Sequence, residues 1–413
     1  MLTVFLKILF KTLFFLKLDL FVYWLILKSG KSFYSSNDKK KCIVINRSIF
    51  QEDMKILEKK IKDVKFVYIH KLFFQAVYEC YFNKKKISHN NFYLDKNTKK
   101  RKLLQKRYNK MLKYFKSKDF IFFASGNFNY VELFDLFKVS NQNNIKILIV
   151  FKEGFGVKKD NLINFFKKYS HFDFNIDLIT FTNNLIKDCA VSYINFVNNK
   201  NSLVIGIPRL EGYIRNYKTT NLKLLYSSYP YDKINLASKF NKEDKDDIIK
   251  KIELMHLNFL KYAKKNNKLK FIIKTKNHIK YINYVNIIKK KYFNKYKFDN
   301  LIITNDNFNG KILDLADTVV SWGSTTILEA LYCNKKVLVP KINEKIDADF
   351  NLTYKNEEEK KKLKNYYEYN SYHEFENSLD KEYEFNQPSL NDTIEQSIPN
   401  FNAGFKYNLN NFF

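Results

Sequence analysis

The sequence is poor in glycine, proline, cysteine and tryptophan. Its 413 residues include 9 Gly, 5 Pro, 4 Cys and 2 Trp. The four cysteines are scattered without any C-x-x-C spacing, so the sequence supports neither a disulfide framework nor a zinc ribbon and favours a reducing compartment. The P-loop pattern G-x-x-x-x-G-K-[ST] and the G-x-S-x-G turn are also absent, which excludes P-loop nucleotide hydrolysis and the usual serine-hydrolase turn.

Metal-binding patterns are equally scarce. The histidines show no metal-ligand spacing. Two D-x-D strings occur, at 244–246 and 347–349, but neither directly follows a hydrophobic strand in the middle of a predicted sheet. We interpret the first as a charged helix start and the second as a loop, and we predict no metal site.

The N-terminal segment is hydrophobic but lacks a run long enough to span a membrane. Lysines and one aspartate interrupt residues 1–28, and the longest uncharged run, 20–27, is far below the ~20 residues that a bilayer requires. On a helix the lysines share about one third of the circumference, and Phe, Leu and Trp24 occupy much of the rest. We therefore expect residues 1–30 to form a membrane-interfacial amphipathic helix. A cleaved signal peptide and an ordinary buried helix are the alternatives.

The chain is globular in composition and strongly basic. Hydrophobic residues make up 45% and aromatic residues 17%, and 73 Lys and Arg stand against 42 Asp and Glu, a net charge of +31. Abundant Lys, Asn, Ile, Phe and Tyr are typical of A+T-rich codons, so lysine content alone is weak evidence of function. Residues 351–413 carry a net charge of −4, however, which leaves +35 on residues 1–350. Such a body favours anionic partners, whether phospholipid surfaces, nucleotides or nucleic acid.

Short β-branched runs alternate with longer helical patterns along most of the chain. Strands are predicted at 42–46, 64–69, 120–124, 145–150, 175–181 and 202–207, and, after Pro208, at 222–228, 269–274, 300–304, 318–322 and 336–340. Strands that alternate with helices predict parallel sheets covered on both faces. We therefore expect an α/β protein with two Rossmann-like domains, 31–215 and 216–350, facing a cleft, followed by an acidic tail, 351–413, that packs across the domains.

The segment 313–340 carries the most specific pattern. A predicted strand ends at Trp322, the chain turns at Gly323, and Ser324, Thr325 and Thr326 open a helix. A helix N-terminus offers unpaired backbone N–H groups, and hydroxyls add further donors, so this geometry suits phosphate. The alternative is structural, because the T-x-x-E spacing from Thr326 is that of a capping box.

The same segment resembles the nucleotide-sugar segment of GT-B glycosyltransferases, especially of bacterial surface-carbohydrate (capsule and lipopolysaccharide) biosynthesis proteins. Their pattern AD-x-x-x-x-x-STT-x-x-EA-L-x-x-x-K-x-V is matched by Ala316, Asp317, Ser324, Thr325, Thr326, Glu329, Ala330, Leu331, Lys336 and Val337. The resemblance implies that the hydroxyl loop binds the donor's phosphates and that Glu329 contacts the ribose. Gly323, directly before the loop, is a candidate because a glycine there permits close approach of the backbone to a phosphate.

A basic strand end adds to the predicted donor site. The run FIIKTKNH, at 271–278, sits where such proteins often have a strand followed by a basic K/R-P-H-P-like turn, which here lacks its proline. The resemblance gives Lys274, Lys276 and His278 as donor-binding candidates. Lys274 is also the candidate catalytic group, because a lysine at a strand's carboxyl end can neutralise a diphosphate leaving group without a metal. A solvated loop lysine is the alternative.

Candidates in the first domain rest on weaker signals. VIGIPRLEGY, at 204–213, resembles the G-x-P-R-x-D/E end of the first domain in related polymer-forming transferases, which implies a hinge there and adds Arg209 to the donor-binding candidates. Residues 125–127 and 152–154 follow predicted strands. Within the second group, Glu153 could be the base that deprotonates an acceptor hydroxyl, although turn-forming residues after strands are commoner than catalytic ones.

Together these patterns predict a glycosyltransferase-like protein of surface polysaccharide biosynthesis that needs no metal and no cofactor, with the nucleotide-sugar as substrate. It would transfer a sugar or sugar-related group to a glycan or lipid-linked acceptor, from a peripheral position on the cytoplasmic face of a bacterial membrane, without a nucleic-acid partner. The alternatives are a nucleotide-sugar 2-epimerase-like enzyme of the same fold, a basic nucleic-acid-binding protein whose affinity falls steeply with salt, and a noncatalytic assembly factor.

Overall fold

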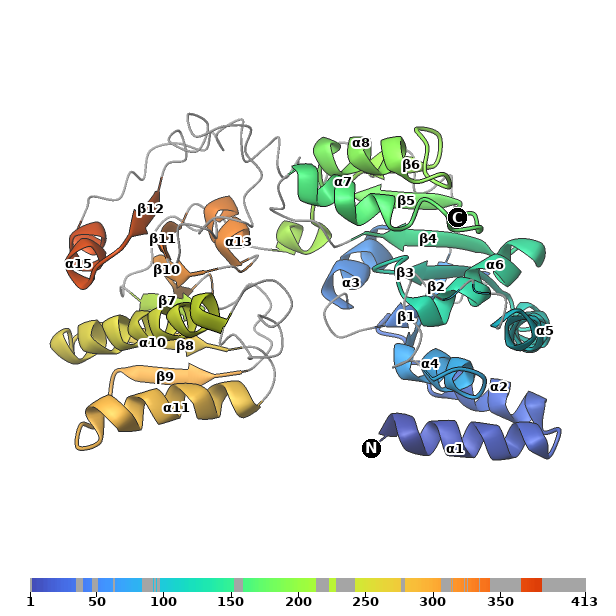
Figure 1. Ribbon diagram of the computed structural model, residues 1–413, viewed down its shortest axis with the longest axis horizontal. Coiled ribbons are helices and arrows are strands. Elements are labelled where there is room, and N and C mark those ends of the chain that lie inside the picture. The colour runs from blue at the N-terminus through green and yellow to red at the C-terminus, as the bar shows by residue number, and fades with distance from the viewer. Residues whose placement is uncertain are drawn as a thin grey trace. The chain divides into compact units, whose positions relative to one another are not determined.

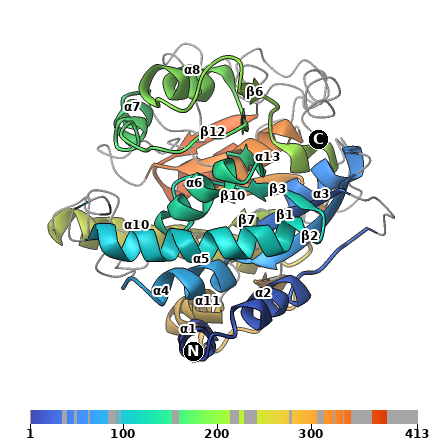
Figure 2. The same cartoon turned by 90° about the vertical axis from the view of Figure 1, so that its right-hand side faces the viewer.

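The chain folds into two compact units that divide between Glu211 and Gly212. The structure, a computed structural model, describes residues 2–34, 40–46, 51–61, 64–83, 92, 94, 97–151, 159–212, 223–227, 242–275, 279–305, 313, 315–322, 324, 326–333, 335–341 and 365–380. Unit 1 holds the described residues up to Glu211, and unit 2 holds those from Gly212. Figures 1 and 2 show the helices and strands of both units.

Unit 1 is built on a six-stranded sheet in the order β2-β1-β3-β4-β5-β6. All neighbouring strands in it are parallel. Its strands are β1 (Lys40–Asn46), β2 (Val64–His70), β3 (Phe120–Ser125), β4 (Lys146–Val150), β5 (Leu178–Phe181) and β6 (Ser202–Val204). In β4, the consecutive residues Ile147, Leu148 and Ile149 are all fully buried. Because successive side chains point to opposite faces, both faces of this sheet are covered.

Helices surround this sheet (Figure 1). They are α1 (Leu2–Phe15), α2 (Asp19–Lys28), α3 (Gln51–Lys60), α4 (Lys71–Glu79), α5 (Thr98–Lys116), α6 (Phe134–Gln142), α7 (Lys159–Lys167) and α8 (Asn184–Tyr193), with 3-10 turns η4 (Val131–Leu133) and η5 (Pro208–Gly212). Helix α3 packs on β2, α5 on β3 and α6, and α8 on β5 and β6. Strands and helices therefore alternate along unit 1 as the sequence predicts.

Unit 2 is also built on a six-stranded parallel sheet, in the order β12-β11-β10-β7-β8-β9. Its strands are β7 (Lys223–Ser227), β8 (Lys270–Lys274), β9 (Leu301–Thr304), β10 (Thr318–Ser321), β11 (Lys336–Pro340) and β12 (Tyr366–Tyr369). Its helices include α10 (Lys242–Lys265), α11 (Ile279–Phe293), α13 (Thr326–Tyr332) and α15 (Tyr372–Asp380). The two parallel sheets with their helices confirm the predicted α/β class and its two Rossmann-like domains; the cleft between them stays a prediction.

The second sheet continues past residue 350, the predicted end of the second domain. Strand β12 pairs in parallel with β11, from Val337 opposite Tyr366 to Pro340 opposite Tyr369. Helix α15 then packs on β12, and Phe375 on its inner face is fully buried. Part of the predicted tail is therefore an edge strand and a covering helix of unit 2. The tail residues before 365 and after 380 lie outside the described residues.

The N-terminal segment forms two helices where the sequence predicts one. Lys17 adopts a left-handed backbone conformation with φ of 59°. The backbone N–H of Leu18 then donates to the carbonyl oxygen of Leu13 at 2.9 Å, which closes the end of α1 as a left-handed C-terminal cap does. Helix α1 packs on α4, and α2 on α5. Within the part of the chain that the structure describes, every helix is too short or too polar to cross a membrane.

A buried carboxyl group links α3 to β2 and gives a pH-dependent prediction. Glu58 is 8% exposed and accepts a hydrogen bond from the Tyr68 hydroxyl at 2.8 Å. Burial raises the pKa of Glu58 to about 7 from 4.5, although the Tyr68 hydroxyl and the Lys55 ammonium favour the carboxylate. The folded pKa exceeds the unfolded one, so this contribution to stability is complete below pH 4.5 and is lost as the pH rises through 7.

We therefore expect the free energy of unfolding to fall, through Glu58, by on the order of 2 kcal/mol between pH 4.5 and pH 8. Urea unfolding measured across that interval checks this change. The Glu58→Gln variant, which cannot titrate at this position, should show a flatter profile. If both proteins follow the same curve, Glu58 does not titrate in this interval.

Candidate functional site

The strand order of unit 2 places a ligand-binding position at one point of the sheet. From β7 the chain proceeds outward to β8 and β9, returns to β10 beside β7, and then proceeds in the opposite direction to β11 and β12. In an open parallel sheet, ligands bind outside the carboxyl ends of the strands where this order reverses. The reversal here lies between β7 and β10, so the segment that follows β10 is the candidate site.

That segment contains the predicted hydroxyl loop. The side chains of Ser324 and Thr326 are both partly exposed. Ser324 Oγ accepts the backbone N–H of Thr326 at 3.3 Å and lies 3.0 Å from Thr326 Oγ1. The carbonyl oxygen of Ser324 accepts the backbone N–H of Ile327 at 3.1 Å. Gly323 and Thr325, the other predicted members of the loop, lie outside the described residues.

These contacts bear on the capping-box alternative. Because Ser324 supplies both the hydroxyl and the carbonyl that receive the first helical N–H groups, Ser324 is the residue that caps α13. Thr326 is then already helical, whereas a capping-box threonine would precede the helix. Glu329 lies within α13 and is partly exposed. The T-x-x-E spacing therefore does not place Thr326 at the cap, and Thr326 and Glu329 remain candidates for ligand contact.

Ser321 is a further hydroxyl at this position, and no sequence pattern indicated it. It is the last residue of β10, is fully buried, and its Oγ has no hydrogen-bond partner among the described residues. A buried polar atom without a partner costs about 1–3 kcal/mol. The following residue, Trp322, is also fully buried, so β10 is anchored in the core directly before the loop. Ser321 is detectable in sequence only as a polar residue ending a hydrophobic strand.

Lys274 ends the strand next to β7. In the sheet ladder, Lys274 of β8 lies opposite Ser227 of β7, and Ser227 in turn lies opposite Ser321 of β10. Lys274 and Ser321 therefore occupy the same level at the carboxyl edge, two strands apart. The Lys274 side chain is partly exposed. Lys276 and His278, the other two candidates of that turn, lie outside the described residues.

Arg209 is held in a buried ion pair within unit 1. Its Nη1 lies 3.0 Å from Asp53 Oδ2, and its backbone N–H donates to Asp53 Oδ1 at 3.0 Å. The side chains are 7% and 6% exposed. This contact joins η5 to α3 and gives Arg209 a structural partner. Its predicted part in donor binding stays a prediction.

The first-domain candidates divide in two. Ser125 ends β3 and Asn127 follows it, at the point where the strand order of unit 1 also reverses. Both are buried, and Ser125 Oγ donates to the Asn127 carbonyl oxygen at 2.9 Å, so they stabilise the turn. Glu153, the predicted base, lies outside the described residues together with its neighbours 152 and 154. Among the residues that are described, no group of three or more His, Cys, Asp or Glu is placed to hold a metal ion.

Comparisons with known proteins give likenesses of fold alone. No family model matches the sequence, and no curated protein matches it. Among solved structures, the chain is similar to UDP-GlcNAc 2-epimerase from Methanocaldococcus jannaschii in complex with UDP-GlcNAc and UDP, at 12% identity and a TM-score of 0.44, over 86% of this chain and 97% of that one. It is also similar to a UDP-forming α,α-trehalose-phosphate synthase from Burkholderia vietnamiensis, at 7% identity and a TM-score of 0.43, over 87% and 93%.

A glycosyltransferase from Rickettsia africae gives a similar result, at 9% identity and a TM-score of 0.43, over 84% of this chain and 88% of that one. With TM-scores below 0.5, these likenesses decide neither the activity nor the ligand of this chain. The geometry at the carboxyl edge of the second sheet is therefore the observation that bears on function.

Proposed function

We propose that this protein is a glycosyltransferase-like enzyme that binds a nucleotide-sugar at the carboxyl edge of the unit 2 sheet. It transfers the sugar, or a sugar-related group, to a cell-surface glycan or lipid-linked acceptor during surface polysaccharide biosynthesis. One observation carries the proposal. Three hydroxyl side chains lie where the sheet order reverses: Ser321 ends β10, and Ser324 and Thr326 follow it. Phosphate groups bind at helix N-termini in such positions.

Each predicted residue has a role in this proposal. The loop 323–326 binds the donor diphosphate, and Glu329 binds the ribose hydroxyls. The acceptor hydroxyl transfers its proton to the Glu153 carboxylate as its oxygen forms a bond to the anomeric carbon. The bond from that carbon to the phosphate oxygen breaks, and the nucleoside diphosphate leaves with the electron pair. Lys274 stabilises the leaving negative charge, with no metal and no cofactor required. Lys276, His278 and Arg209 are further donor contacts.

The cellular setting belongs to the same proposal. A chain with a net charge of +31 is attracted to anionic surfaces and ligands. We place the enzyme peripherally on the cytoplasmic face of a bacterial membrane, where a lipid-linked acceptor would be presented to it, and we assign it no nucleic-acid partner.

Thermal unfolding with UDP, GDP, CMP and CDP conjugates tests the donor site. A ligand at 100 times its Kd adds about 2.7 kcal/mol to the free energy of unfolding, which should raise Tm by about 5 °C or more. Thr326→Val, which removes a hydroxyl at nearly constant volume, and Glu329→Ala should each reduce this shift. Asn183→Ala is the matched control, because Asn183 caps α8 in unit 1 by accepting the Ile186 N–H at 2.9 Å.

The control variant should lower Tm without changing the shift produced by the nucleotide. If no conjugate raises Tm, or if Thr326→Val responds as the unaltered protein does, the proposed donor site is wrong. Incubation with UDP-N-acetylglucosamine and no acceptor separates the nearest alternative, since appearance of the 2-epimer would identify an epimerase.

A further inference from the structure

The two N-terminal helices each bury one face and expose a second apolar face. In α1, Leu6, Phe10 and Phe14 are buried against the rest of unit 1. Phe5 and Ile8, on the other side of the helix, are 61% and 62% exposed. From Phe5 and Ile8 the exposed positions continue to Thr12 and Phe15, always three or four residues apart, so they share one face of the helix. Phe15 is 84% exposed. This helix is therefore apolar on two sides, only one of which the fold covers.

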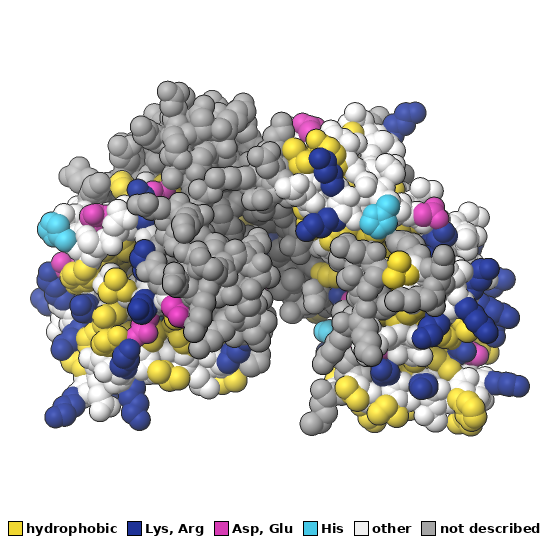
Figure 3. Space-filling model, in the orientation of Figure 1, with side chains coloured by type: hydrophobic (Ala, Val, Ile, Leu, Met, Phe, Trp, Pro, Cys, Tyr) yellow, Lys and Arg dark blue, Asp and Glu magenta, His cyan; other side chains and the backbone are white. Residues whose placement is uncertain are grey.

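Helix α2 and the turn before it continue this surface. Val22, Tyr23 and Ile26 are buried, whereas Phe21 and Trp24 are 47% and 43% exposed and stack with ring centroids 5.6 Å apart. We call the set of exposed apolar residues the α1–α2 face; its members are Leu2, Val4, Phe5, Ile8, Phe15, Leu16, Leu18, Leu20, Phe21 and Trp24. Exposed apolar side chains gathered in this number mark an interaction surface. Figure 3 shows hydrophobic and lysine side chains side by side along the edge of unit 1 that carries α1.

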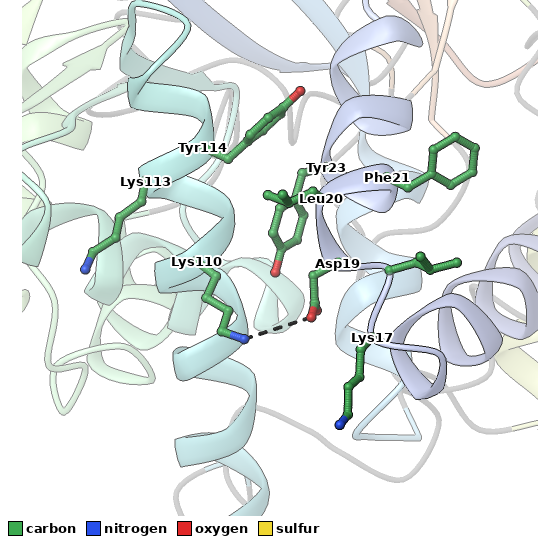
Figure 4. A pocket seen from close by; sticks show the side chains of 9 residues that line it. Lys17, Asp19, Leu20, Phe21, Tyr23, Lys110, Lys113 and Tyr114 are labelled. Atoms are coloured by element: carbon green, nitrogen blue, oxygen red, sulfur yellow. Dashed lines mark ion pairs between the residues drawn. The ribbon is translucent and has the colours of Figure 1, made fainter.

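A groove with a cationic rim adjoins this face. It encloses about 770 Å³ between the turn, the start of α2, and α5, and its lining includes Lys17, Phe21, Lys113 and Tyr114. Its one carboxylate, Asp19, is paired with Arg107 and lies 3.9 Å from Lys110 Nζ. Figure 4 shows Lys110 directed toward Asp19, with Lys17 and Lys113 extending away on opposite sides. Among the described residues neither Lys17 nor Lys113 forms an ion pair, so the rim keeps a positive charge.

The charge around the face selects its occupant. Helix α5 carries nine Lys and Arg and no acidic residue. A second copy of the chain docked through the same face would bring two such cationic rims together, which opposes association. An anionic bilayer offers both complements at once: acyl chains for the apolar side chains and lipid phosphates for the lysines.

We infer that the α1–α2 face docks on an anionic phospholipid bilayer, with its apolar side chains at the acyl boundary and lipid phosphates in the groove beside Lys17 and Lys113. The helices lie on the bilayer and do not cross it. The buried side of each helix packs on α4 or α5, so this surface is folded before it meets a bilayer, in contrast to a lone amphipathic helix that orders only on binding. The inference rests on the proposed function only for the purpose of docking, which is to bring the enzyme to a lipid-linked acceptor. Binding to the bilayer itself requires no nucleotide.

Sedimentation with vesicles tests the assignment on the full chain. Vesicles of phosphatidylcholine with one quarter phosphatidylglycerol should bind the protein, and pure phosphatidylcholine vesicles should bind it about ten-fold less. Ile8→Asp should weaken binding to the anionic vesicles about ten-fold. Its matched control is Ile287→Asp, because Ile287 is a 65% exposed isoleucine on α11 of unit 2. Lys113→Glu should weaken binding by a similar factor, and Lys268→Glu, at an exposed turn of unit 2, should not.

Tryptophan fluorescence adds a residue-specific measurement. The chain has two tryptophans, Trp24 in the α1–α2 face and Trp322, which is fully buried in unit 2. Anionic vesicles should shift the emission to shorter wavelength and shield it from acrylamide. The Trp24→Phe variant should still sediment with the vesicles but show neither change.

Several outcomes would overturn the inference. Ile8→Asp and Ile287→Asp could lose vesicle binding equally, or neutral and anionic vesicles could bind equally well. A dimer in solution that Ile8→Asp dissociates would assign the face to a second copy of the chain. Because the nucleotide-induced rise in Tm is measured without vesicles, retention of that rise alongside absent vesicle binding rejects the docking face alone. The converse result rejects the donor site alone.

Discussion

Replacing Asp53 with alanine should destabilise unit 1 by about 3–5 kcal/mol, because it leaves the Arg209 guanidinium buried without its carboxylate. The pair is 7% and 6% exposed, and the Nη1–Oδ2 distance is 3.0 Å. The same carboxylate accepts the backbone N–H of Arg209 at 3.0 Å, so the substitution also removes the contact that fixes η5 on α3. Urea unfolding followed by circular dichroism measures the loss.

Two controls separate burial of charge from mere loss of a surface contact. Asp299→Ala removes an exposed ion pair, in which Lys297 and Asp299 are 91% and 79% exposed, and should cost less than about 1 kcal/mol. The double variant Asp53→Leu with Arg209→Met replaces the pair by apolar side chains, and it should regain much of the stability that Asp53→Ala loses. A loss below 1 kcal/mol for Asp53→Ala would mean that water reaches the guanidinium.

The double variant also tests Arg209 as a donor contact. If Arg209 acts only through its ion pair, the folded double variant should keep the nucleotide-induced rise in Tm. If the guanidinium also contacts the donor, this rise should be reduced even though the fold is intact. The two roles are therefore distinguishable in one protein.

The sheets were predictable because their strands are continuous β-branched and aromatic runs. The run 120–124 was expected as a strand and β3 covers Phe120–Ser125; the run 336–340 was expected and β11 covers Lys336–Pro340. Strands buried on both faces have no polar alternation, so such runs stand out from the helices between them. By contrast, β12, with the sequence YYEY, is an edge strand in an acidic segment. Nothing local distinguishes it from a tail, since its stability comes from pairing with β11.

The sequence patterns could not predict the order of the strands. They place Ser324 and Thr326 after a strand, but only the sheet ladder shows that β10 pairs with β7 and so puts this loop where the order reverses. Partners far apart in sequence are similarly hidden, as the separation between Asp53 and Arg209 illustrates. The break at Lys17 was missed because hydrophobic residues stand on both sides of it, at 16 and 18, whereas the left-handed cap depends on a backbone contact to Leu13.

The second large effect is expected at Lys71, the first residue of α4. Its Nζ lies 2.5 Å from Glu132 Oε1 and 3.4 Å from the centre of the Tyr130 ring, and the side chains of Lys71 and Glu132 are 5% and 2% exposed. The contact joins the carboxyl end of β2 to η4, the turn that follows β3. Lys71→Met keeps the length of the side chain but removes the cation, and it should cost about 3–5 kcal/mol of unfolding free energy at neutral pH.

The pH dependence of that variant shows whether the lost charge is the cause. Without Lys71, burial should raise the pKa of Glu132, so the folded variant binds a proton that the unfolded chain releases at neutral pH. Its stability relative to the unaltered protein should then recover toward pH 5. Lys291→Met provides the comparison, because Lys291 pairs with Glu253 at 2.7 Å while 57% exposed, and it should cost less than about 1 kcal/mol. A loss at Lys71→Met that does not change with pH would assign the effect to packing on Tyr130.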